Sequence, residues 1–194
     1  DITASNGILG SLSSLFQSVT LRTAGYNTID LTLLSESTLF LMLILMLIGA
    51  SPASTGGGLK TTTIATLFLT VKSFIIGKED IEVYQRRISD ATVKKSLGIF
   101  FIGVFISLFG TLMLTIVNPG FTLLESSFEV ISAYATVGLS IGGTPSLTYL
   151  GKIIIIILMF LGRVGSLTIF IALLSKNSRV KSKIRYTEGK IIVG

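Results

Sequence analysis

An unbroken run of uncharged, mostly apolar residues extends from Leu97 to Val117. As an α-helix, a run of this length would span about 30 Å, which matches the hydrocarbon thickness of a bilayer. Of the 194 residues, 49% are hydrophobic and only 13% are charged, so the chain has too few charges to cover a water-soluble fold. The sequence therefore predicts an all-α membrane protein.

Two further apolar regions flank this run. Glu36–Ile76 would form about 60 Å of helix, twice the thickness of the membrane, but Gly49–Thr63 interrupts it with Pro52 and three consecutive glycines. The other region, Tyr149–Leu174, would form about 40 Å of helix and carries Arg163 near its middle. We therefore expect three passes, the first of them a helix that is broken inside the membrane.

The lysines and arginines predict the orientation of these passes. They cluster in the loop 77–95 and the tail 176–194, whereas the stretch 118–148 contains none. Both basic segments should be cytoplasmic in a multi-pass protein of the cell (plasma) membrane. Because the net charge of +6 comes from residues between apolar runs, we expect membrane lipid and no nucleic acid as a partner.

The composition also limits the chemistry. The chain has no His and no Cys, which excludes disulfides, thiolate nucleophiles, most zinc and haem sites and Ser-His hydrolases. We expect no enzyme and no covalently bound cofactor. An intramembrane enzyme and a purely structural membrane subunit are the alternatives. The sequence begins at Asp1 with no Met, so we expect a piece of a longer protein.

Two shorter segments, Ile8–Thr28 and Phe121–Thr144, are too short to span and too apolar for solvated loops. In each, about ten helical residues, Gly10–Val19 and Leu124–Tyr134, precede a Gly-containing run. The pattern predicts two re-entrant hairpins, because irregular backbone at membrane depth must be buried in protein or line a cavity.

A shift of the chain by 113 positions aligns these hairpins and the helices that follow them. The shift predicts tandem helix–re-entrant pore loop–helix repeats of the potassium-channel kind, with the first helix of the first repeat lying before Asp1. We assign 1–92 to the first repeat present, 93–176 to the second and 177–194 to a cytoplasmic tail. The shift pairs Ser14 with Ser127, Thr23-Ala24-Gly25 with Thr136-Val137-Gly138, Met46 with Met159 and Gly49 with Gly162.

The two Thr-x-Gly turns predict a cation filter. Glycine permits backbone dihedrals that aim successive carbonyls at one axis, and rings of such carbonyls replace the water shell of potassium. The C-terminal ends of the short helices before the turns would add partial negative charge there. The predicted filter residues are Arg22, Thr23, Ala24, Gly25, Ala135, Thr136, Val137 and Gly138.

The interruption of the broken helix predicts a gate, because its Gly and Ser residues supply flexibility and small volume beneath the filter. Arg163 pairs with Ala50 under the same shift, so we expect its guanidinium to hold carbonyls freed by the break. A phosphate-binding loop is excluded, since Leu59 separates Gly58 from Lys60. The predicted gate residues are Gly49, Ser54, Thr55, Gly56, Gly57, Gly58, Lys60 and Arg163.

Four motifs together resemble one family: RTAGYN at 22–27, GASPASTGGGLKTTT at 49–63, ATVGLS at 135–140 and GRVGSLTIF at 162–170. They are similar to the Trk/Ktr/HKT superfamily of potassium transporters, most closely to the KtrB type of membrane pore subunit in Ktr systems. The resemblance implies potassium uptake, a homodimer, a cytosolic ring of nucleotide-binding regulatory subunits and sodium as an activating ion. It also implies that the chain holds the third and fourth of four repeats.

The glutamates on the second re-entrant helix, Glu125 and Glu129, are not expected to be ion ligands. We expect them to face the outer mouth or to accept hydrogen bonds from turn amides.

Overall fold

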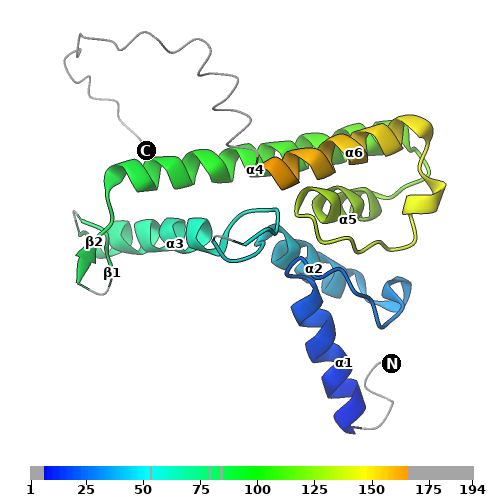
Figure 1. The fold of residues 1–194 in the computed structure, drawn as a ribbon, viewed down its shortest axis with the longest axis horizontal. Coiled ribbons are helices and arrows are strands. Elements are labelled where there is room, and N and C mark those ends of the chain that lie inside the picture. Colours follow the sequence, from blue (N-terminus) through cyan, green and yellow to red (C-terminus); the bar gives the residue numbers. More distant parts are fainter. Residues whose placement is uncertain (1–6, 53, 79, 84, 166–194) are drawn as a thin grey trace.

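The computed structural model describes residues 7–52, 54–78, 80–83 and 85–165, and their fold is a set of packed helices (Figure 1). The segment 166–194 lies outside the described residues, and with it the predicted tail and the end of the last apolar run. The α-helices are α1 (Gly7–Thr20), α2 (Glu36–Leu47), α3 (Thr61–Ile76), α4 (Asp90–Val117), α5 (Leu123–Tyr134) and α6 (Tyr149–Val164), with short 3-10 helices η2 (Leu31–Leu33) and η3 (Thr144–Ser146) before α2 and α6.

The longest helix, α4, has 28 residues and begins seven residues before the apolar run at Leu97. Ser89 starts it by accepting a hydrogen bond from the amide of Thr92, a contact that a purely apolar pattern does not reveal. The segment 90–95, which we expected in the connecting loop, is therefore helical. Among the described residues, α4 is the one helix long and apolar enough by itself to cross a membrane.

Helix α5 lies at the centre of the packing. It contacts α4, α6 and α2, and α3 packs along the other end of α4 (Figure 1). One apolar core joins Phe128 of α5 to Met42 and Met46 of α2, and a second joins Val130 to Leu158 of α6. Helix α5 is therefore held on several sides, which fixes the segment that follows it.

Helix α1 projects away from this packed group (Figure 1). Its apolar side chains are largely exposed, with Ile8 at 86% and Leu15 at 62%. After it, Asp30 caps η2, and hydrogen bonds from the hydroxyl and the amide of Thr32 hold the pKa of Asp30 below its usual value.

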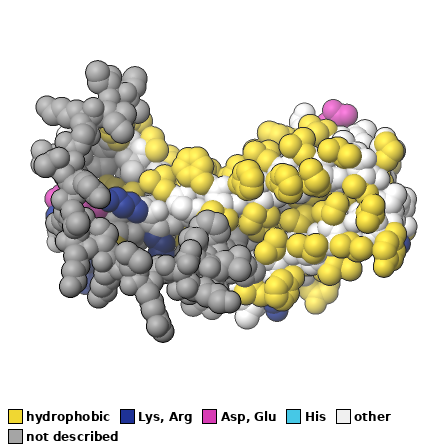
Figure 2. Space-filling view, turned by 90° about the horizontal axis from the view of Figure 1, so that it is seen from above, with side chains coloured by type: hydrophobic (Ala, Val, Ile, Leu, Met, Phe, Trp, Pro, Cys, Tyr) yellow, Lys and Arg dark blue, Asp and Glu magenta, His cyan; other side chains and the backbone are white. Residues whose placement is uncertain are grey.

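The connection between α3 and α4 contains a small antiparallel hairpin of β1 (Glu82–Val83) and β2 (Arg86–Arg87). Arg87 Nε lies 2.9 Å from Asp80 Oδ1, an exposed ion pair of small energetic weight. Basic side chains gather near this end, whereas hydrophobic side chains cover the described surface at the far end (Figure 2).

Candidate ion pathway

The first turn follows directly from α1. The amides of Ala24 and Gly25 both donate to the carbonyl of Thr20, at 3.2 and 3.3 Å, which closes the helix end. Thr23 has φ +66° and Gly25 has φ +75°, so two residues of the turn lie in the left-handed region. A threonine rarely adopts this conformation, and such strained backbone is concentrated at functional sites.

The second turn, which follows α5, has the same form. Thr136 has φ +57° and Gly138 has φ +90°, at the two positions that the 113-residue shift pairs with Thr23 and Gly25. The amide of Val137 donates to the carbonyl of Ser132 at 2.9 Å. Two segments far apart in the sequence therefore share an uncommon backbone conformation.

The flanking elements keep the same spacing. Helix α2 begins 113 residues before α6, and η2 begins 113 residues before η3. Ser35 caps α2 by accepting from the amide of Thr38, and Thr148 caps α6 by accepting from the amide of Gly151. Hydroxyl groups also close both turns: Thr20 donates to the carbonyl of Tyr26 at 2.6 Å, and Ser132 donates to the carbonyl of Leu139 at 2.5 Å.

The two turns are in contact with each other. A Cβ added to Gly25 would collide with the carbonyl oxygen of Val137. At Gly138 the same construction meets no atom of the described residues within 4 Å, so the backbone there borders open space among them. The predicted filter residues are thus brought together as two adjoining turns, one face of which is unobstructed at Gly138.

The interruption between α2 and α3 packs against both turns. The amide of Gly57 donates to Oγ1 of Thr136 at 2.8 Å. A Cβ on Gly56 would lie 2.7 Å from Oγ1 of Thr23, and one on Gly57 would lie 2.8 Å from Oγ1 of Thr136. Only residues without side chains allow this approach, which is the reason for glycine at both positions.

Two sets of hydrogen bonds within this loop hold its ends together and link Lys60 to its middle. The amide of Gly49 donates to the carbonyl of Leu59 at 2.8 Å, and Leu59 is fully buried. The ammonium group of Lys60 donates to the carbonyls of Ser54 and Gly56, at 3.1 and 2.5 Å. Lys60 thereby satisfies carbonyls that helix hydrogen bonds would otherwise occupy.

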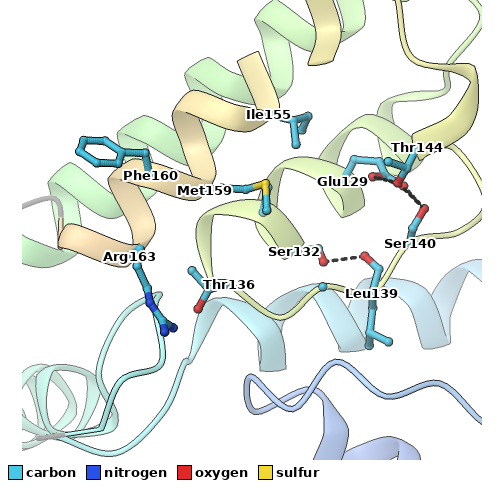
Figure 3. A pocket seen from close by; sticks show the side chains of 12 residues that line it. Glu129, Ser132, Thr136, Leu139, Ser140, Thr144, Ile155, Met159, Phe160 and Arg163 are labelled. Atoms are coloured by element: carbon cyan, nitrogen blue, oxygen red, sulfur yellow. Dashed lines mark hydrogen bonds between the residues drawn. The ribbon is translucent and has the colours of Figure 1, made fainter. Parts of the chain in front are cut away.

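Arg163, near the end of α6, reaches the same loop. Its Nη1 donates to the carbonyl of Thr55 at 3.0 Å, and Figure 3 shows the side chain pointing from α6 towards the loop. The expected contact between this guanidinium and a carbonyl of the interruption is therefore present. It is an exposed contact in the described chain.

A cavity of about 600 Å³ lies beside the second turn, between α5 and α6 (Figure 3). Its polar lining includes Glu129, Thr136 and Arg163, and its apolar lining includes Met159 of α6. Among the residues that the structure describes, no group of three or more Asp, Glu, His or Cys could hold a metal ion. The oxygens available beside the turns are mainly backbone carbonyls and hydroxyls.

The two glutamates of α5 have different partners. Glu125 accepts from the amide of Thr122 at 2.8 Å and so completes the start of its own helix, rather than accepting from an amide of the turn. Glu129 is 5% exposed and accepts from the hydroxyls of Ser140 and Thr144 rather than from amides. Sequence reasoning missed these hydroxyls, because they lie 11 and 15 residues away with no local pattern.

A model of the TrkH family, described as a cation transport protein, matches residues 10–181 of the chain. The chain belongs to the TrkH family. The resemblance inferred from the four motifs is thereby confirmed. The family consists of transport proteins rather than enzymes, so the enzyme alternative is excluded.

Members of the TrkH family from bacteria are similar over nearly the whole chain. "Ktr system potassium uptake protein D" of Bacillus subtilis is 42% identical over 93% of this chain and 40% of its own length. "Potassium/sodium uptake protein NtpJ" of Enterococcus hirae is 40% identical over 94% of this chain and 41% of its own length. The chain thus spans about two fifths of the length of the relatives it matches.

The crystal structure of the potassium transporter TrkH from Vibrio parahaemolyticus has a similar fold. Its TM-score is 0.75 with 23% sequence identity, over 91% of this chain and 40% of that one. The helical fold of a TrkH family member is therefore shown for the described residues.

Proposed function

We propose that this chain forms part of the ion-conducting path of a potassium uptake protein, with Arg22–Gly25 and Ala135–Gly138 as two quarters of a carbonyl-lined filter. The observation that carries the proposal is the pair of adjoining turns with the same left-handed Thr and Gly. Carbonyls presented by such turns are the ligands that replace the water shell of potassium. The matched spacing of η2 and α2 with η3 and α6 supports a tandem-repeat origin of the two turns.

The proposed path continues at the interruption Gly49–Thr63, which we propose as the gate within a broken helix; its last residues, Thr61–Thr63, form the start of α3. The contacts of the loop with Thr23 and Thr136 support this assignment, because they join it to both proposed filter turns. Lys60 and Arg163 hold it through carbonyl contacts and place two positive charges beside it. A fixed positive charge raises the energy of a cation nearby, which adds an electrostatic barrier to the steric one.

Further proposals for the full-length protein rest on the family resemblance. We assign it to the plasma membrane as a multi-pass homodimer, with 77–95 cytoplasmic and a ring of nucleotide-binding regulatory subunits on that side. The names of the relatives from Bacillus subtilis place them in Ktr systems, and that from Enterococcus hirae includes sodium. Sodium as an activating ion is part of the same proposal.

Gly138→Ser in the full-length protein tests the filter assignment. A Cβ at this position would meet no atom of the described residues, so we expect the variant to fold, while the added Cβ opposes φ +90° and enters the open space. We expect potassium-uptake-deficient cells that carry it to lose growth at low potassium, or purified protein to lose discrimination against sodium. Unchanged uptake and selectivity would contradict the assignment.

Variants of Arg163 test the gate. Arg163→Gln removes the charge and keeps a donor, and Arg163→Ala removes both. We expect faster potassium flux from both variants, with the larger increase for Ala, because the latch to Thr55 and the barrier are both lost. Deletion of several residues between 53 and 58 should raise flux further. Slower flux in both Arg163 variants, from correctly assembled protein, would show that Arg163 supports an open path instead.

A further inference from the structure

Beyond the hydroxyl that closes each turn, the second turn has another connection to its helix. Glu129 of α5 accepts hydrogen bonds from Ser140 and Thr144, which lie just after the turn (Figure 3). Thr144 Oγ1 also lies 2.9 Å from Ser140 Oγ, and the amide of Gly142 donates to Ser140 Oγ at 3.1 Å. One buried carboxylate therefore organises the whole segment 140–144.

The first turn has no equivalent of Glu129 with its two hydroxyl donors, Ser140 and Thr144. The 113-residue shift pairs Glu129 with Phe16, Ser140 with Asn27 and Thr144 with Leu31. Phe16 has no carboxylate to accept hydrogen bonds, and neither Asn27 nor Leu31 has a hydroxyl group to donate one. The connection is thus a property of the second turn and not of the repeat.

The energetic argument favours a role beyond packing. A carboxylate at 5% exposure loses most of its hydration, and hydrogen bonds from hydroxyls recover only part of that cost. An apolar residue could fill the same volume without that cost. What the carboxylate adds is direction, because charge-assisted hydrogen bonds are short, strong and geometrically specific.

The position of Glu129 indicates that it orients the backbone after Gly138. Gly138 borders open space, and a cavity of about 600 Å³ lies beside the turn, so that side provides little packing to hold the backbone after Gly138. The nearest polar anchors are the bond from Ser132 to the carbonyl of Leu139 and the bonds to Glu129. Without Glu129, the polar link from α5 to this segment would rest mainly on the bond from Ser132 to the carbonyl of Leu139, while Ser140 would still accept from the amide of Gly142.

We infer that Glu129 is a positioning residue: through Ser140 and Thr144 it fixes the backbone that follows the second turn, and with it the direction of the Gly138 carbonyl. Both of its carboxylate oxygens accept hydrogen bonds from Ser140 and Thr144, so we assign it no contact with the ion. The inference rests on the proposed filter, because it assigns to Glu129 the selectivity of the second turn in particular.

Two measurements on the full-length protein test this inference. The first is the ratio of potassium to sodium uptake for Glu129→Gln, with Glu125→Gln as a matched control on the same helix. Loss of a charge-assisted bond should lower the ratio about tenfold in Glu129→Gln, and Ser140→Ala should lower it less, because Thr144 remains. Glu125→Gln should leave the ratio unchanged, since Glu125 caps the far end of α5.

The second measurement does not depend on transport. Leu139 is 3% exposed, so a single cysteine in a Leu139→Cys variant, with no other cysteine in the protein, should react slowly with a membrane-impermeant thiol reagent. Adding Glu129→Gln should raise its labelling rate about tenfold, whereas adding Glu125→Gln should not. If the protein transports no potassium, the proposed function fails while this labelling still tests the position of the segment.

The outcomes are distinct. Lower selectivity and faster labelling confined to Glu129→Gln and Ser140→Ala support the inference. Equal effects in Glu125→Gln, or unchanged selectivity and labelling in Glu129→Gln, would overturn it. If Glu129→Gln does not assemble, Ser140→Ala decides, and unchanged labelling in that variant would overturn the inference.

Discussion

Helices α1 and α5 end in turns of the same conformation but have very different surroundings. In α5, seven of 12 residues are buried, whereas in α1 only three of 14 are. Thr23 and Thr136 nevertheless both have positive φ, as do Gly25 and Gly138. The form of the turn is therefore a local property of the Thr-x-Gly segment and the helix end before it, and packing determines only how firmly it is held.

The comparison extends to the glycines at the paired positions 49 and 162. A Cβ on Gly162 would collide with the carbonyl of Tyr134, so α6 approaches α5 through backbone contact. A Cβ on Gly49 would collide with the carbonyl of Gly57, within the loop itself. Glycine thus allows two helices to pack closely at position 162 and allows a loop to close on itself at position 49.

The largest expected effect is that of Gly162→Ala. Two packed helices cannot separate without loss of their shared core, so we expect the free energy of unfolding in detergent to fall by about 1–3 kcal/mol. Gly49→Ala should cost less, because the loop can shift. Gly98→Ala is the control, since a Cβ there meets nothing within 4 Å and alanine favours a helix. Equal losses for Gly162→Ala and Gly98→Ala would contradict this view of the packing.

A second comparison uses the turn glycines. Both Gly25→Ala and Gly138→Ala place a Cβ at positive φ, at roughly 1 kcal/mol each. Gly25→Ala also collides with the carbonyl of Val137. We therefore expect thermal unfolding of the Gly25→Ala protein at a lower temperature than that of Gly138→Ala. The reverse order would mean that the two turns are not in contact.

The helix caps give the last comparison, in which Ser35→Ala should have the smaller effect. Ser35→Ala removes one cap hydrogen bond, at about 1 kcal/mol. Thr148→Ala should cost about twice as much, because the Thr148 hydroxyl also donates to Oδ1 of the buried Asn118 at 2.6 Å. Thr148→Ser keeps the hydroxyl and should restore most of the loss in denaturant titrations. Equal losses in the free energy of unfolding for Ser35→Ala and Thr148→Ala would show that the bond from Thr148 to Asn118 adds nothing to the cap of α6.

Much of the helical arrangement could be predicted from the sequence. The predicted helices Gly10–Val19 and Leu124–Tyr134 agree closely with α1 and α5, because the glycine-containing turns that end them are visible in the sequence. The break within Glu36–Ile76 falls between Leu47 and Thr61, where the glycine triplet and Pro52 disfavour a helix. The start of α4 was predicted too late, since Ser89 and a polar first turn extend the helix beyond its apolar run.

The contacts across the site needed the tertiary structure. The sequence by itself determined the membrane character, the family and the two turns, because hydropathy, glycine and helix ends act over short stretches of chain. Only the tertiary structure decided that Gly56 and Gly57 lie against Thr23 and Thr136, and that Glu129 binds hydroxyls beyond the second turn. These contacts join residues distant in the chain, and their geometry depends on how the helices pack, which no local pattern encodes.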